Sequence, residues 1–289
     1  MHSDTASTSS TAITVTPQAP PVWDPQQYLR HSGHRARPFH DLLARIPELP
    51  DTGRRPRIAD LGCGPGNVTA LLADRWPDAH ITGLDLSPEM LARAEHEHAG
   101  STPGGGTLDF RHADIARWMP AEPFDLIVSN AALQWVPSHP GSFPAWVNAL
   151  APGGTFAFQV PDNYTAPSHS LLSALCETPR WRDRLGGQGK RYVHLLEPAE
   201  YLARLIELGC TTDVWETTYH QLLQGPDPVF DWVKGTALRP VLTALHGDPK
   251  ATEEFLEQYR DVLRGAYPPG PRGTVFPFRR IFVVAHKED

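Results

Sequence analysis

Residues 57–160 alternate between two hydrophobic patterns. Between short apolar runs, apolar residues recur at helical spacing, as in residues 68–73. The apolar runs are nearly continuous, which is typical of parallel strands buried on both faces. They cover residues 57–59, 80–85, 108–112, 124–130 and 155–160. This alternation predicts a doubly wound, mostly parallel α/β sheet.

The pattern changes after residue 160. Residues 163–200 and 225–275 carry helical patterns with many aromatic side chains, and residues 213–217 and 280–285 are predicted to form the last two strands. We expect the intervening helices to form a cap over the carboxyl edge of the sheet, where ligands bind in such folds. Most of the aromatic residues are expected in the core of this cap. Residues 151–154 (Ala-Pro-Gly-Gly) are expected to break the chain before the fifth strand.

Composition narrows the class of protein. Of 289 residues, 40% are hydrophobic, enough for one large core, and we expect a single domain over residues 22–289. Residues 1–21 are rich in Ser, Thr and Pro and lack a secretion signal, so a disordered tail is expected there. The formal charge of −7 argues against a nucleic-acid binder but permits a local cation cluster for an anionic substrate.

Cysteine usage and hydropathy predict the compartment. The three cysteines are widely spaced and show no paired metal spacing, which predicts a reducing environment without disulfides. No apolar run approaches membrane-spanning length. We therefore expect a soluble, cytoplasmic protein that binds neither membranes nor a metal ion.

The most informative segment is Asp60-Leu61-Gly62-Cys63-Gly64-Pro65-Gly66-Asn67, between the first strand and a helix. A dinucleotide fingerprint would need Gly or Ala where Asn67 stands, and no Gly-Lys-Ser/Thr run follows to make a P-loop. The carboxylate of Asp60 would repel a pyrophosphate but suits a cation, such as the sulfonium and ammonium of S-adenosylmethionine. The alternative is a tight corner at which glycine only permits the backbone geometry.

Polar residues also end the next strands. Asp85, 25 residues after Asp60, is placed to accept hydrogen bonds from ribose hydroxyls. Ser87 and Pro88 predict a helix start, after which Met90 either lies against an adenine or is plain core. Asp114, beyond the third strand, either accepts the adenine amino group or caps the following turn.

These segments and their order resemble the class I S-adenosylmethionine-dependent methyltransferases. The resemblance extends from about Trp23 to the C-terminus and narrows to the trans-aconitate 2-methyltransferase family. Its more specific motifs are Trp23-Asp24-Pro25, Arg35-Ala36-Arg37-Pro38, Asn130-Ala131-Ala132-Leu133-Gln134-Trp135, Gln159-Val160-Pro161-Asp162-Asn163, Trp215-Glu216-Thr217-Thr218-Tyr219 and Gly235-Thr236-Ala237-Leu238-Arg239-Pro240.

The resemblance implies a Rossmann-like, seven-stranded, mostly parallel sheet with a helical cap. It also implies a monomer that acts on a small anionic substrate. It implies methyl transfer from S-adenosyl-L-methionine to a carboxylate of a small polycarboxylic acid, giving a monomethyl ester and S-adenosyl-L-homocysteine. The implied cofactor-binding residues are Asp60, Gly62, Cys63, Gly64, Gly66, Asn67, Asp85, Leu86, Met90, Ala113, Asp114, Ile115 and Asn130.

A carboxylate acceptor, with a pKa of about 4, is already ionised at neutral pH, so the reaction needs alignment and water exclusion rather than a general base. Arg, Trp and Tyr donors suit the substrate's carboxylates. The candidates are Trp135, Arg239, Arg35 and Tyr28, with Tyr164, Arg280, Lys190, Arg191 and Tyr192 as weaker ones. Arg239 is the leading distal anchor, Trp135 is either a donor to the attacking carboxylate or packing under the cap, and Arg37 is expected on a solvated helix face.

Two other functions stay open at this point. One is methyl transfer to a different small-molecule acceptor. If that acceptor were a hydroxyl or an amine, His139 or His194 would be the natural base. A non-catalytic S-adenosylmethionine binder would keep the cofactor motif without an acceptor site.

Overall fold

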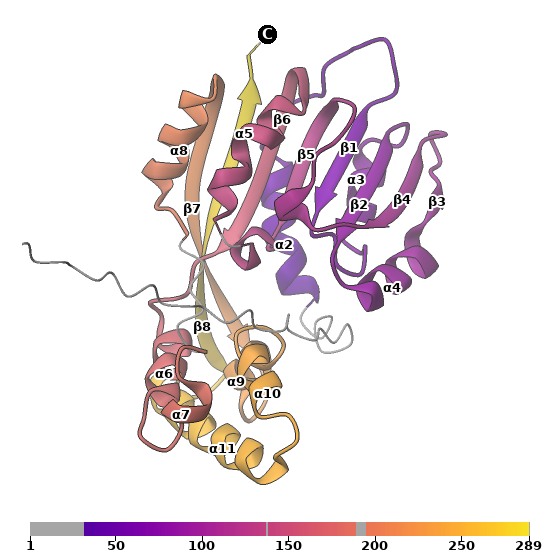
Figure 1. The fold of residues 1–289 in the computed structure, drawn as a ribbon. Helices are drawn as coiled ribbons and strands as arrows, with labels where there is room; N and C mark the ends of the chain where they lie inside the picture. Colours follow the sequence, from indigo (N-terminus) through magenta and orange to yellow (C-terminus); the bar gives the residue numbers. More distant parts are fainter. Residues whose placement is uncertain (1–31, 137, 189–194, 289) are drawn as a thin grey trace, which may run out of the picture.

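The computed structural model describes residues 32–136, 138–188 and 195–288, and its centre is an eight-stranded sheet (Figure 1). The strand order is β3-β4-β2-β1-β5-β6-β8-β7, in which β8 runs antiparallel to both of its neighbours and β3 antiparallel to β4. The other neighbours are parallel. The strands are β1 (Arg57–Leu61), β2 (His80–Asp85), β3 (Gly100–Ser101), β4 (Thr107–His112), β5 (Phe124–Asn130), β6 (Leu150–Pro161), β7 (Cys210–Leu223) and β8 (Thr274–Lys287).

The predicted Rossmann-like fold is confirmed, with three differences in its strands. The two-residue β3 adds an eighth strand at one edge, where the sequence shows no apolar run. β7 and β8 are both longer than predicted. The prediction that residues 151–154 break the chain is wrong, because β6 runs through them with a register shift against β5. Gly153 permits this irregularity with its φ of +68°.

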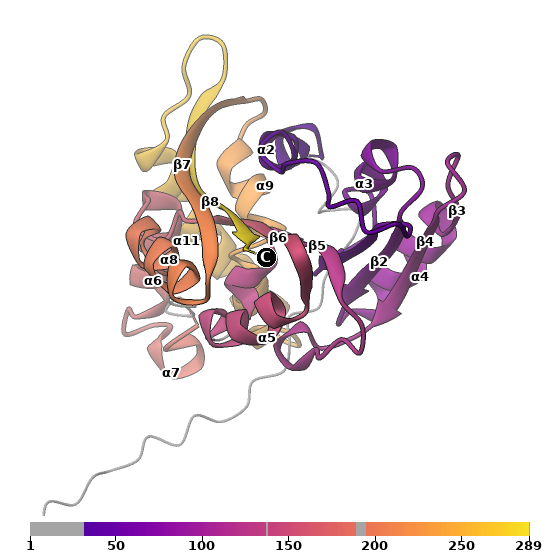
Figure 2. The same cartoon turned by 90° about the horizontal axis from the view of Figure 1, so that it is seen from above.

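Helices cover both faces of the sheet, and Figure 2 shows α2 and α3 on one side and α5 and α8 on the other. Buried residues of the first face join α2 (Ser32–Leu43), α3 (Thr69–Arg75) and α4 (Pro88–His98) to the strands. Those of the second face join α5 (Phe143–Asn148) and α8 (Pro198–Glu207) to them. Alternating strand residues supply the two cores: Ile58 faces the first and Ala59 the second.

The remaining helices form the cap. It lies at one end of the sheet, beside the C-terminal half of β7 and the N-terminal half of β8 (Figure 1). The cap helices are α6 (Pro167–Cys176), α7 (Arg182–Leu185), α9 (Pro228–Lys234), α10 (Arg239–Ala244) and α11 (Pro249–Ala266). As predicted, their aromatic residues are cap core: Trp181, Trp232, Phe255 and Tyr259 share one buried cluster. α8, whose first residues fall within the predicted cap segment, packs on the sheet instead.

This arrangement decides where a ligand can bind. The ends of β1, β2 and β5, which are followed by the glycine turn, by α4 and by Ala131, lie at the same edge of the sheet because these strands are parallel. No helix in the described part of the chain combines the length and apolar character needed to cross a membrane.

Candidate active site

The glycine turn after β1 has the backbone geometry that only glycine adopts readily. Gly62, Gly64 and Gly66 have φ values of +78°, +55° and +79°. The amides of Gly62 and Cys63 both donate to the carbonyl of Leu84, at 2.7 and 3.0 Å, which ties the turn to β2. A Cβ on Gly62 would lie 2.2 Å from Ala132 Cβ, whereas one on Gly64 would meet no atom of the described residues within 4 Å. The turn is therefore closely packed at Gly62 and open at Gly64.

Asp60 is a buried carboxylate with one unsatisfied oxygen. It is 1% exposed, its Oδ2 accepts a 2.7 Å hydrogen bond from Thr69 Oγ1, and its Oδ1 has no partner within the described structure. Burial raises the pKa of Asp60 to about 7, with the charge of Asp85 adding to the rise and the Thr69 bond opposing it. Such an oxygen beside an open turn suits a cationic or hydrogen-bond-donating ligand.

Asp85 ends β2 and organises the same edge. One of its carboxylate oxygens accepts from the amide of Gly64 at 2.8 Å and the other from the amide of Ser87 at 2.9 Å. Ser87 caps α4 as predicted, because its Oγ accepts from the amide of Met90. Leu86 is 51% exposed next to this carboxylate, while Met90 is buried.

The segment after β4 completes this side. Asp114 caps the short 3₁₀ helix Ile115–Arg117 by accepting from the amide of Ala116 at 3.0 Å, as one of its two sequence readings required. The amide of Ala113 donates to the carbonyl of Asp85 at 3.0 Å. Ala113 and Ile115 pack into the core of the second face, which fixes this turn beside β2.

The end of β5 is held in an uncommon conformation. Ala131 follows Asn130 with a φ of +53°, a left-handed conformation that costs an L-residue about 1–2 kcal/mol. Two bonds hold it there: its amide donates to the carbonyl of Gln159 at 3.0 Å, and its carbonyl accepts from Gln134 Nε2 at 2.6 Å. The bend leads into the 3₁₀ helix Leu133–Trp135, in which Trp135 is half-buried.

Arg280 brings a buried positive charge to this edge. It is 4% exposed, opposite Pro161 at the end of β6, and its guanidinium carbon lies 5.0 Å from the centroid of the Phe278 ring. Its Nη1 donates to Gln159 Oε1 at 2.8 Å, and Gln159 Nε2 donates to Asn130 Oδ1 at 2.5 Å. The candidates Arg280 and Asn130 are therefore joined through a residue that the sequence reasoning did not select.

Two missed residues left a signal in the sequence. Gln159 is a polar residue near the end of an otherwise apolar strand, and it is fully buried. Thr69 is a buried polar residue in the first turn of α3, where its hydroxyl reaches back to Asp60. A buried polar side chain needs a hydrogen-bonding partner, so such positions in apolar segments indicate polar neighbours.

The other candidates lie in the cap, in the segment after β6, in α2 or outside the described residues. Arg239 is the first residue of α10 in the cap, and half-buried Tyr164 follows β6 with its ring 5.6 Å from that of His169. Arg35 lies in α2, but its side chain is outside what the structure describes, as are Tyr28 and residues 190–192. The exposed side chain of Arg37 agrees with a solvated helix face, although it also lies over the Tyr219 ring.

His139, considered above as a base, is buried in the second face. Its Nε2 is 2.8 Å from the hydroxyl of Tyr201 on α8, and its ring lies against Phe143. Burial lowers the pKa of His139 to about 4, so the ring is neutral but enclosed. Among the described residues, no three His, Cys, Asp or Glu side chains are arranged to hold a metal ion.

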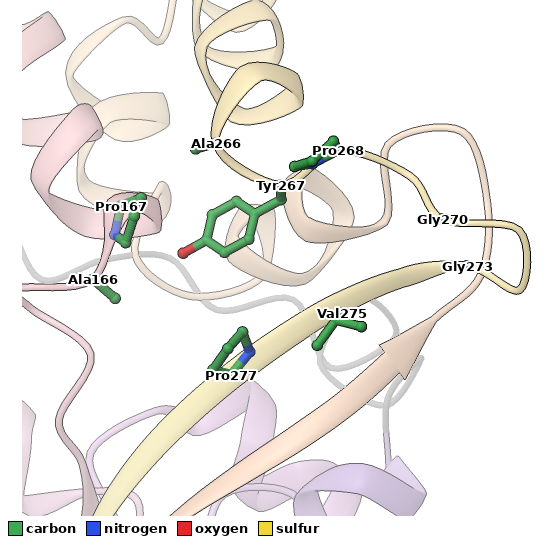
Figure 3. A pocket seen from close by; sticks show the side chains of 9 residues that line it. All are labelled: Ala166, Pro167, Ala266, Tyr267, Pro268, Gly270, Gly273, Val275 and Pro277. Carbon is green, nitrogen blue, oxygen red and sulfur yellow. The ribbon is translucent and has the colours of Figure 1, made fainter.

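A pocket of about 460 Å³ lies elsewhere, between α6, the end of α11 and the hairpin that starts β8 (Figure 3). The side chains that line it are apolar except for Tyr267, whose hydroxyl accepts from the amide of Ser168. None of the described side chains that line it is charged, so the pocket does not suit a polyanion.

Comparison with known proteins agrees with this geometry. Residues 58–154 match a family model described as a methyltransferase domain. Among solved structures, the YcgJ protein of Bacillus subtilis shares the fold with a TM-score of 0.54 at 14% identity, covering 89% of this chain and 99% of that one. A Haemonchus contortus phosphoethanolamine N-methyltransferase, solved in complex with S-adenosyl-L-methionine, has a TM-score of 0.50 at 16% identity, covering 88% of this chain and 53% of that one.

The cofactor is S-adenosyl-L-methionine, and the residues at the sheet edge fit it. The unsatisfied oxygen of Asp60 suits its cationic end, and the open side of the turn at Gly64 lets a ligand approach the backbone.

Curated relatives match over nearly the whole chain. A trans-aconitate 2-methyltransferase of Streptomyces coelicolor is 62% identical over 273 residues, covering 94% of this chain and 89% of the relative. One of Streptomyces avermitilis is 63% identical, covering 94% and 99%. The chain belongs to the trans-aconitate 2-methyltransferase family.

Proposed function

We propose that the enzyme transfers the methyl group of S-adenosyl-L-methionine to a carboxylate of trans-aconitate, giving the monomethyl ester and S-adenosyl-L-homocysteine. Relatives more than 60% identical to this chain are named trans-aconitate 2-methyltransferase. The observation that carries the proposal to this chain is Arg280, a cation only 4% exposed at the edge of the sheet that holds the glycine turn. A guanidinium placed there matches a carboxylate in both charge and shape.

The reaction makes small demands on proton transfer. When bound, S-adenosyl-L-methionine supplies an electrophilic methyl group on its sulfonium. An ionised carboxylate attacks such a carbon without giving up a proton, so the protein needs no general base. The enclosed position of His139 fits this, because its Nε2 faces Tyr201 rather than an acceptor.

The protein's task is then positioning and water exclusion. We assign Asp60 and the turn from Gly62 to Gly66 to the methionine end of the cofactor and Asp85 to its ribose. Each oxygen of Asp85 accepts one backbone bond and keeps capacity for another. Leu86, Met90 and the turn Ala113–Ile115 are assigned to the adenine side.

The acceptor's carboxylates are assigned to donors from both parts of the molecule. Arg280 binds one carboxylate at the sheet edge, and the indole N–H of Trp135 directs the attacking one. Arg239 in the cap remains the proposed distal anchor. Arg35, Tyr28 and Tyr164 stay predictions, Arg35 because only its backbone in α2 is described.

We also propose that the enzyme works as a cytoplasmic monomer on a small molecule and binds no nucleic acid. All three cysteines are buried thiols that form no disulfide within the described residues, which fits a reducing compartment.

The proposal is tested by incubating the protein with methyl-labelled S-adenosyl-L-methionine and trans-aconitate, with cis-aconitate, citrate and isocitrate in parallel. We expect a base-labile ester to form fastest with trans-aconitate. Cofactor binding without label in any of the four acids would contradict the proposal and favour a different acceptor or a non-catalytic binder.

The raised pKa of Asp60 predicts pH-dependent cofactor binding. Below about pH 7 the carboxyl is increasingly protonated in the free protein, and a cationic ligand binds the ionised form better. Affinity for S-adenosyl-L-methionine should therefore rise with pH up to about 7 and level off above it. Calorimetric titrations between about pH 5.5 and 8.5 check this.

Asp60→Asn is the control for this prediction. It keeps an acceptor for Thr69 and cannot ionise, so its affinity should be lower at high pH and independent of pH. The same pH dependence in this variant would assign the effect to another group.

A further inference from the structure

Polar residues cross the carboxyl edge of the sheet in strand order. The strands β2, β1, β5, β6 and β8 lie side by side in this order, and each contributes one polar residue. In the same order these residues are Asp85, Asp60, Asn130, Gln159 and Arg280. The first two lie on the proposed cofactor side, and Arg280 is the proposed acceptor ligand. Gln159 stands between the two sides and has no role in the family assignment given above.

Besides its place in the ladders of the sheet, Gln159 makes hydrogen bonds to Arg280, Asn130 and Ala131. Its Oε1 accepts from Arg280 Nη1 at 2.8 Å, and its Nε2 donates to Asn130 Oδ1 at 2.5 Å. Its backbone carbonyl accepts from the amide of Ala131 at 3.0 Å and so holds the left-handed bend before Trp135. Gln159 is fully buried, so water does not compete for these bonds.

The direction of each side-chain bond follows from what its members can do. A guanidinium only donates, so the group of Gln159 that faces Arg280 must be its oxygen. The amide nitrogen of Gln159 then faces Asn130 and must find an acceptor there, which is Oδ1. The amide nitrogen of Asn130 is left to donate elsewhere. Arg280 thus fixes the orientation of both amides.

We infer that Gln159 is a positioning residue that holds the Arg280 guanidinium for an acceptor carboxylate. It also turns the amide of Asn130, which the family resemblance assigns to the cofactor, so that its N–H groups serve the same anion. This inference rests on the proposed function. It predicts that an anionic acceptor meets donors from both β5 and β8. Gln159 is neutral, so it can bond to Asn130 and Arg280 at once without cancelling the charge of Arg280.

Gln159→Glu is the sharpest test, because the new side chain has the same shape but is ionised. It would pair with Arg280, cancel its charge and be unable to donate to Asn130. We expect KM for trans-aconitate to rise about 10- to 100-fold, while the dissociation constant of S-adenosyl-L-methionine changes less than about threefold. The dissociation constant of trans-aconitate from the S-adenosyl-L-homocysteine complex, measured by calorimetry, should rise in parallel with KM.

Gln159→Met is the second variant, because it removes both side-chain bonds but leaves the charge of Arg280 in place. It should lower kcat more than it raises KM, since the charge remains but is no longer oriented. Gln221→Glu is the matched control: Gln221 is also a buried glutamine of this sheet, 6% exposed on β7. The Gln221→Glu variant also places a carboxylate in the buried part of the sheet, which costs folding free energy. Its melting temperature should therefore fall, while its KM for trans-aconitate stays unchanged.

The outcomes separate the inference from the proposed function. If the wild-type enzyme methylates trans-aconitate and both Gln159 variants keep its KM and kcat, or Gln221→Glu raises KM equally, the inference is overturned. If the wild-type protein binds trans-aconitate without methylating it, the proposed function fails, and the dissociation constants still decide the inference. If it does not bind trans-aconitate at all, both fail.

Discussion

Replacing Arg280 by Met should lower kcat/KM for trans-aconitate by about 100- to 1000-fold, corresponding to about 3–4 kcal/mol. Arg280 is 4% exposed, so little water screens its attraction for a carboxylate. The loss should fall on the acceptor, because Asp60 and Asp85, the carboxylates proposed for the cofactor, belong to β1 and β2, which β5 and β6 separate from β8. Steady-state kinetics with varied trans-aconitate, together with calorimetric titration of S-adenosyl-L-methionine, measure the two effects.

The neighbouring arginine is the matched control. Arg279 faces the other way on β8 and pairs with Asp162, with Glu216 at 2.5 Å and with Glu197 at 3.4 Å. Arg279→Met should lower the melting temperature, because it leaves these carboxylates without their cation, and keep kcat/KM within about threefold of wild type. An equal loss of activity in both variants would show that the effect is structural and would count against the role of Arg280.

Replacing Gly64 by Ala should weaken S-adenosyl-L-methionine binding by about 10- to 100-fold while the protein stays folded. Among the residues that the structure describes, none lies within 4 Å of the added methyl, so the cost to folding is about 1–2 kcal/mol for a left-handed conformation with φ of +55°. The methyl would project into the open side of the turn, which we assign to the cofactor. Calorimetry and thermal unfolding without ligand separate the two effects.

Gly62→Ala should show the opposite balance. Its methyl would lie 2.2 Å from Ala132 Cβ at a residue with φ of +78°, so the turn and the bend after β5 must move apart. We expect a much larger fall in melting temperature than for Gly64→Ala. Equal stability losses in the two variants, with cofactor affinity kept in Gly64→Ala, would contradict an open ligand site at Gly64.

The sequence predicted the sheet well because its central strands are buried on both faces. β2 and β5 have the bounds that their apolar runs indicated, and Ser87 caps α4 where expected. The prediction of a chain break at residues 151–154 was wrong. These residues contain Pro and two Gly, yet they continue β6, because Phe124 of β5 pairs with Leu150 and a bulge takes up the residues that follow. The sequence also placed too little of the chain in β7, whose polar positions hid its length.

The candidate site divides in the same way. The residues assigned to the cofactor lie on turns with local signals, so Asp60, Gly64 and Asp85 could be proposed from the sequence by their spacing and charge. The acceptor side is assembled from segments more than 100 residues apart, such as Arg280 and Gln159. No local pattern reports such a pair. On sequence alone Arg280 ranks below Arg239, because consecutive basic residues such as Arg279 and Arg280 usually lie on a solvated face.

By itself, then, the sequence determined the Rossmann-like fold, the glycine turn and the carboxylates near the ends of β1 and β2, because each depends on periodicity or on local backbone geometry. Only the tertiary structure decided that Asp60 is buried with a raised pKa, that His139 is enclosed against Tyr201, and that Gln159 joins Arg280 to Asn130. These properties depend on burial and on hydrogen bonds between distant segments, which arise only when β6 and β8 pair in the folded chain.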